Sequence, residues 1–183
     1  MLATFDVDVT PPLGVYMAYD PVKRVDELTL RSRGIIIKGN NAAIVLCAVD
    51  FIGIANEAHD VWRETIAAAA GTTFDRVALH ALHQHDAPRV DFTAEQILRD
   101  ADVSQPGSFD GTFARQAMHN TAAAVQAALQ NLQPVTHVGF GSAEVIDIAS
   151  NRRILGDDGK VRVTRFTATR DPAVRAEPVG TID

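Results

Sequence analysis

Alternating apolar and polar residues predict strands in the first third of the chain. Phe5 to Thr10 alternates and predicts a first strand, which Pro11 ends with a turn. Residues 34–38 and 42–49 predict two more strands. The segment between them, Gly39-Asn40-Asn41, is typical of a hairpin turn because Gly and Asn adopt positive φ at low cost.

Apolar residues at helical spacing appear further along the chain. Residues 55–70 place an apolar stripe on one face of a helix, and Gly71 is a suitable stop. Residues 76–82 predict the next strand, with apolar residues on both faces. A strand, a helix and a strand in this order favour a right-handed crossover between parallel strands. Residues 92–100 and 110–131 predict a short and a long helix.

The remaining segments are less regular. Residues 15–33 are polar and predict a surface loop or the wall of a cleft, and residues 135–149 are extended. Residues 153–163 predict a second hairpin around Asp-Asp-Gly. The pattern fades after Thr167, so we expect a poorly packed tail. The whole predicts an α/β fold with a mixed parallel and antiparallel sheet flanked by helices, as an incomplete domain.

Composition limits the function. The chain has 183 residues, a length that fits one domain. Its net charge is −6, and it has no basic patch that would bind nucleic acid. Cys47 is the only cysteine and lies in an apolar run, so any metal must be held by His, carboxylate or other oxygen ligands. No segment has the length of a transmembrane helix, and residues 1–4 are too short for a signal peptide before Phe5.

The densest polar cluster runs from His80 to Pro88, where the predicted strand ends. In an extended chain, side chains two apart point the same way, so His83 and His85 share a face and His80 points to the other. Two imidazoles on one face can hold one metal ion. Judged by spacing alone, such a pair is as often structural, but a third histidine and Asp86 close by favour chemistry.

Four segments in order resemble the neutral/alkaline non-lysosomal ceramidase family. Asp8–Gly14 resembles its opening Asp-Ile-Thr-Pro-Pro-x-Gly, and Val45–Asp50 is similar to its strand that ends in Asp. Leu82–Pro88 resembles the family's Thr-His-Thr-His-Ser-x-Pro, with Gln and Asp in place of the second Thr and the Ser. Ser150–Arg153 is similar to its later Asn-Arg element. The resemblance spans nearly the whole chain and suggests a divergent member.

Members of that family are zinc amidases that cleave the amide between a fatty acid and a sphingoid base. The resemblance implies that His83 binds zinc, that His85 lies at or beside the metal, and that Arg152 holds or polarises a substrate oxygen. The family's other ligands (a second His, a Glu and a Tyr) and its serine match no residue of 1–183. The resemblance thus implies the N-terminal portion of a catalytic domain, inactive without the missing C-terminal part. It also suggests a secreted or periplasmic full-length form.

Other polar residues have competing interpretations. Asp50 either faces the pocket or caps a turn, and Asn151 accompanies the predicted catalytic arginine. Asp86 and Asp91 either orient a ligand histidine or bond their own backbone. One alternative is a complete small metal hydrolase with a third ligand from His137, Asp50 or Asp91. Another is a non-catalytic binding domain in which the histidines are structural.

These inferences give a geometric expectation. His83, His85, Asp50 and Arg152 should surround one solvent-open cleft at strand ends, shaped for a small or lipid-like amide. Apolar surface should be exposed where the missing part would pack.

Overall fold

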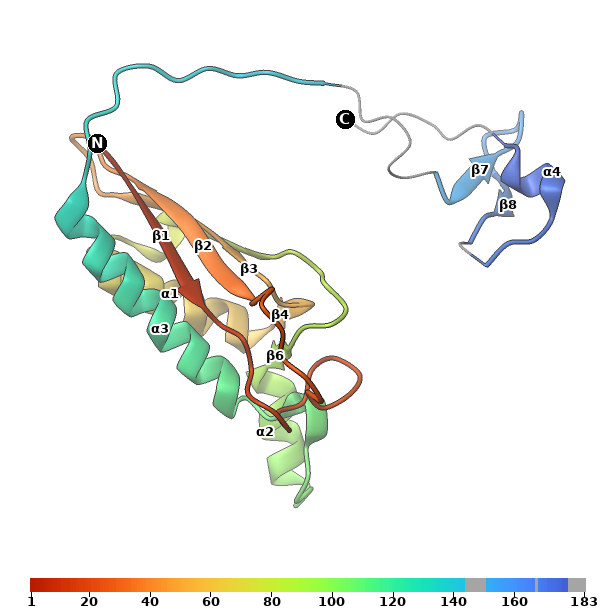
Figure 1. Cartoon of the computed structure of the whole chain (residues 1–183), viewed down its shortest axis with the longest axis horizontal. Coiled ribbons are helices and arrows are strands. Elements are labelled where there is room, and N and C mark those ends of the chain that lie inside the picture. The colour runs from red at the N-terminus through yellow and green to blue at the C-terminus, as the bar shows by residue number, and fades with distance from the viewer. Residues whose placement is uncertain (144–150, 167, 178–183) are drawn as a thin grey trace. The chain divides into compact units, whose positions relative to one another are not determined.

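The computed structural model describes residues 1–143, 151–166 and 168–177 (Figure 1). The chain divides into two compact units, Met1–Thr136 and His137–Asp183, and each is described by itself. Among the described residues, no helix is both long enough and apolar enough to cross a membrane.

A mixed four-stranded sheet forms the centre of the first unit. Its strands lie in the order β1 (Leu2–Asp8), β2 (Arg31–Ile37), β3 (Ile44–Val49) and β5 (Val77–Ala81). β1 with β2 and β2 with β3 are antiparallel, whereas β3 and β5 are parallel. Helix α1 (Glu57–Ala70) joins β3 to β5, so the predicted antiparallel hairpin and the predicted parallel strand pair linked by a helix are confirmed. The hairpin turn does not use the positive φ that was expected at Gly39, Asn40 or Asn41.

Helices cover one face of this sheet. α1 and α3 (Thr112–Ala128) pack together against it, and α2 (Phe92–Asp100) contacts α1 (Figure 1). The buried Glu95 of α2 bonds Arg115 of α3, and this hydrogen bond holds the pKa of the Glu95 carboxyl below its usual value. The fold is therefore α/β with a mixed sheet and flanking helices, as predicted.

The uncovered face of the sheet carries apolar side chains. Ile37 and Ile44 are direct cross-strand partners and are 41% and 37% exposed, and Leu46 further along β3 is 40% exposed. Their neighbours Ile36 and Val45 point the other way and are fully buried. Within the first unit, the sheet thus has one core face and one face open to solvent, on which these three apolar side chains share the surface with the charged Asp6, Arg31 and Arg33.

The first two strands extend beyond their predicted bounds. β1 starts at Leu2 rather than Phe5, and β2 starts at Arg31, inside the segment expected to be a loop. Asp6 accepts hydrogen bonds from Arg31 and Arg33 across the strand pair, and the Arg31 bond lowers the pKa of its carboxyl. The polar start of β2 is held in the sheet by its bonds to β1, and the residue pattern of one strand alone cannot show such a bond.

The strand before the histidines was predicted to have apolar residues on both faces, but only one of its faces is buried. β5 is the edge strand, with Val77 and Leu79 buried and the alternate Ala78 and His80 exposed. Its outer carbonyls are occupied by α1 side chains, since Arg63 donates to Val77 O at 2.9 Å and His59 Nε2 bonds Leu79 O at 3.2 Å. These bonds take acceptors that an added strand would need.

A second, shorter pair of strands was not predicted. β4 (Gly53–Ala55) and β6 (Arg89–Asp91) pair in parallel. They follow β3 and β5 along the chain, and so they keep residues 49–55 beside residues 81–91.

The second unit contains the other predicted hairpin. β7 (Arg153–Leu155) and β8 (Val161–Thr164) are antiparallel, and Gly159 in the turn has a φ of 73°. The tail after Thr167 holds a short helix that was not predicted, α4 (Pro172–Arg175), which Asp171 caps through a bond from Ala173 N.

Two predicted segments fall partly outside the description. In the segment 135–149, predicted to be extended, residues 135–143 form no regular strand, and the remainder lies outside the described residues. In the tail after Thr167, residues 178–183 also lie outside the described residues.

Gly34 tests the packing of the sheet. It pairs directly with Phe5, and a Cβ added there would lie 2.2 Å from Leu46 O and 2.3 Å from Phe5 Cζ. Gly34→Ala should therefore lower the free energy of unfolding by about 3 kcal/mol, at the upper end of overpacking costs. Gly39→Ala is the control, since its Cβ would meet no atom within 4 Å. Equal urea midpoints for the two variants would contradict this packing.

Candidate functional site

The histidine segment is fixed beside the chain that leaves β3. Leu82 N donates to Val49 O and His83 N donates to Phe51 O, both at 3.0 Å. Ile52 N donates back to Pro88 O at 2.9 Å. Because β3 and β5 are parallel, both chains leave the sheet at the same edge, and these bonds hold the loop at its two ends.

His83 and His85 are neighbours, but not for the predicted reason. The strand ends at Ala81, and His83 has a φ of 64°, in the left-handed region rather than the extended one. The two rings nevertheless lie with centroids 5.2 Å apart and planes at 80°. A non-glycine residue in this region stores strain of order 1 kcal/mol, which the bonds of the loop must hold.

The ring of His83 is oriented by a backbone carbonyl. Its Nδ1 lies 2.8 Å from Ile52 O. A carbonyl oxygen only accepts, so Nδ1 carries the proton, and in the neutral ring Nε2 keeps its lone pair. Metal-binding histidines commonly have this arrangement, with one nitrogen donating to a carbonyl and the other on the metal. Both histidines are exposed to solvent.

Tyr19 is a neighbour of the pair that the sequence did not indicate. Its ring centroid lies 5.6 Å from that of His85, at an interplanar angle of 64°. Ala18 N donates to Ala87 O at 2.9 Å, which fixes this part of the loop against the histidine segment. Residues 15–33 were predicted to cover the surface or line a cleft, but nothing in their spacing singled out Tyr19.

Two of the predicted carboxylates bind backbone groups instead of histidines. Asp50 Oδ2 accepts from Arg31 N at 2.8 Å. Asp91 Oδ1 accepts from Ala94 N at 2.9 Å and caps α2, while its Oδ2 accepts from Asn56 Nδ2 at 2.6 Å. The described residues show no bond from either carboxylate to a histidine ring, so the capping interpretation fits both.

The predicted arginine lies in the second unit. Arg152 is exposed and its guanidinium carbon lies 5.3 Å from the Phe166 ring centroid. Asn151 Oδ1 accepts from Arg153 N at 3.0 Å, which is a local turn. His137 also belongs to this unit. The approach of Arg152 to the histidines stays a prediction.

Among the described residues, no further metal ligand joins the two histidines. Across residues 1–143, 151–166 and 168–177, no three His, Cys, Asp or Glu side chains gather to hold a metal ion. Catalytic zinc takes about three protein ligands and one open position. His83 and His85 would supply two of them.

Comparison with known proteins leaves the resemblance untested. A scan of protein-family models finds no match to this chain, and a search of curated proteins finds none either.

Proposed function

We propose that the protein is a zinc-dependent amide hydrolase of the neutral ceramidase type, acting on an N-acyl sphingoid or a related lipid-like amide. This chain would be the N-terminal portion of its catalytic domain. One observation carries the proposal: His83 donates Nδ1–H to Ile52 O, which leaves Nε2 ready for a metal, with the His85 ring beside it. The four motifs in family order add to it.

The residues present suit part of a zinc site. His83 would bind through Nε2, and His85 would bind or steady the site from the adjoining position. Bound zinc would supply a Lewis acid that polarises the amide carbonyl or lowers the pKa of a water molecule. The Ile52 carbonyl sets the ring angle of His83 and increases its basicity.

The chain's other contribution would be a fixed cation. Arg152, if it approaches the histidines as predicted, would hold the acyl oxygen as negative charge develops on it. In the overall reaction, a water oxygen bonds to the acyl carbon and the C–N bond breaks. The electron pair of the broken C–N bond goes to the nitrogen, which takes up a proton and leaves as the amine.

The open sheet face supports the proposed partner, the missing C-terminal part of the same protein. Ile37, Ile44 and Leu46 leave an apolar surface on the central strands, which a further layer of structure would bury. That part would also bring the remaining zinc ligands and the serine.

An amide hydrolysis assay tests this function. The substrates are an N-acyl sphingoid base and a simpler N-acyl amide, with added zinc. This chain alone should show no turnover, because two histidines do not fix catalytic zinc. A longer form of the protein should show turnover that a chelator or His83→Ala abolishes.

Two results would contradict the proposal. Turnover by this chain alone, lost in His83→Ala, would favour the complete small metal hydrolase. A longer form with unchanged metal content and activity after substitution of both His83 and His85 would favour the binding domain with structural histidines.

A further inference from the structure

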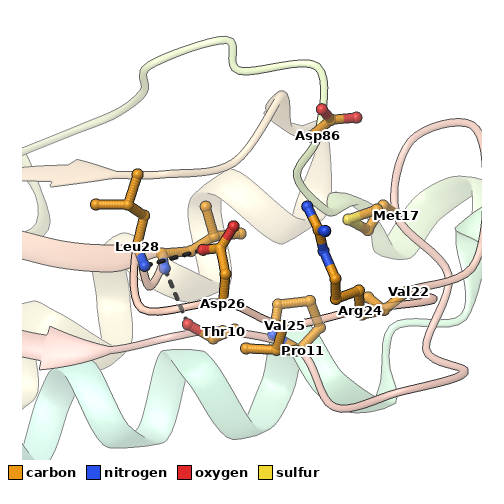
Figure 2. A pocket seen from close by; sticks show the side chains of 10 residues that line it. Thr10, Pro11, Met17, Val22, Arg24, Val25, Asp26, Leu28 and Asp86 are labelled. Carbon is orange, nitrogen blue, oxygen red and sulfur yellow. Dashed lines mark hydrogen bonds between the residues drawn. The ribbon is translucent and has the colours of Figure 1, made fainter.

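A small cavity adjoins the histidine segment. It has a volume of about 250 Å³ and lies between the chain after β1 and the loop of residues 15–30 (Figure 2). This is below the roughly 300–1,000 Å³ of pockets for drug-sized ligands, so it suits a small molecule. Its apolar walls include Pro11, Met17, Val22 and Leu30.

Two opposite charges line the cavity without pairing. In Figure 2 the side chain of Arg24 extends toward the side where Asp86 lies. Within the described part of the chain, neither side chain forms an ion pair or a hydrogen bond. A third charge, Asp26, also lines the cavity; its Oδ1 accepts a hydrogen bond from Leu28 N at 2.9 Å, and the carboxylate keeps its negative charge. Arg24 and Asp86 are the lining charges whose side chains bond no other group in the described part of the chain.

These charges select the ligand. A simple anion at Arg24 would be repelled by the Asp86 and Asp26 carboxylates, and a simple cation at Asp86 would be repelled by Arg24. A molecule with a hydrogen-bond acceptor for Arg24, a donor for Asp86 and an apolar group for the apolar wall matches this lining. We propose that this cavity binds an α-amino acid with an apolar side chain, its carboxylate on Arg24 and its nitrogen on Asp86.

The position of Asp86 connects the cavity with the candidate zinc site. Asp86 directly follows His85 in the loop that backbone hydrogen bonds hold at both ends, so the lining of the cavity adjoins the histidine segment along the chain. Resting on the proposed function, this makes the amine half of the substrate an apolar amino acid. The amide would be an N-acyl amino acid, and water would convert it into a carboxylate and the free amino acid, which takes the proton on its nitrogen.

Calorimetric titration with L-leucine and its analogues tests the cavity without any catalysis. L-leucine and N-acetyl-L-leucine should bind the chain. Leucinamide, which lacks the carboxylate, and 4-methylpentanoate, which lacks the nitrogen, should bind at least about tenfold more weakly, since each loses a charge-assisted hydrogen bond. Arg24→Ala should weaken leucine binding by a similar factor, and so should Asp86→Asn.

Lys23→Ala is the matched control, because Lys23 is an exposed cation that faces Asp20 and does not line the cavity. It should leave leucine affinity unchanged. Absence of leucine binding, or equal effects of Lys23→Ala and Arg24→Ala, would overturn the proposal. So would tighter binding of 4-methylpentanoate to Asp86→Asn than to the parent, with leucine unaffected, since that marks a plain anion site.

The result is separable from the proposed function. His83→Asn should remove zinc binding and leave leucine affinity unchanged. Leucine binding with no zinc-dependent hydrolysis in a longer form would support the cavity and overturn the function. Hydrolysis of N-acyl sphingoid amides with no leucine binding would overturn the cavity proposal alone.

Discussion

His83→Asn should lower zinc affinity by more than about a hundredfold in a longer form of the protein. Removing only the group that hydrogen-bonds to a metal-binding side chain lowers metal affinity by about 10–100-fold, so loss of the metal-binding side chain itself should lower it by at least as much. Asparagine suits the position, because it tolerates the left-handed φ of 64° and its amide can donate to Ile52 O. The fold should thus survive, and zinc titration with a urea unfolding curve would check both.

His119→Asn is the matched control for this prediction. His119 is an exposed histidine on α3, and it should be replaceable without loss of zinc. His83→Ala should lose zinc equally and also some stability, since alanine neither bonds Ile52 O nor favours positive φ. Equal zinc affinity in His83→Asn and His119→Asn would contradict the assignment.

Trp62→Ala should lower the free energy of unfolding by about 3–5 kcal/mol, the usual cost of emptying a large buried aromatic site. Trp62 is fully buried on α1, and Phe51 packs edge-on against it with centroids 5.5 Å apart. Total stabilities are about 5–15 kcal/mol, so this change would remove a large share of the free energy of unfolding. Urea unfolding followed by circular dichroism measures it.

Trp62→Phe is the matched variant. Trp62 Nε1 is buried and has no hydrogen-bond partner in the described structure. Replacement by phenylalanine therefore removes no hydrogen bond and keeps most of the buried apolar area. We expect a loss of less than about 2 kcal/mol. A Trp62→Phe variant as unstable as Trp62→Ala would show that the indole N–H has a partner that matters.

The parts of the fold set by local pattern were predictable. α2 has the predicted bounds of 92–100, and α1 begins within two residues of its predicted start and ends at Ala70, before the predicted stop at Gly71. The crossover from β3 through α1 to β5 followed from their order. Each of these depends on residues close in the sequence.

The parts set by distant pairing were not predictable. β4 and β6 are three residues each, and they form because residues 36 positions apart in the sequence pair. The polar start of β2 at Arg31 depends on Asp6 in another strand. A single sequence shows no signal for either contact.

The candidate site was predicted in part. The spacing of His83 and His85 indicated neighbours, and they are neighbours, but through a left-handed residue rather than an extended strand. The bond to Ile52 O and the contact with Tyr19 depend on how three loops meet, which no local pattern encodes. Asp50 and Asp91 were plausible for the metal by residue type, and their backbone partners could be identified only from the fold.

Imidazole ¹⁵N chemical shifts during a zinc titration of this chain test directly whether His83 and His85 bind zinc. His83 should be protonated on Nδ1 before zinc is added, and zinc, bound weakly, should shift His83 Nε2 together with a nitrogen of His85. His59 and His119 should not move. Zinc that shifts those histidines and leaves His83 unchanged, or a His83 ring protonated on Nε2, would contradict this prediction.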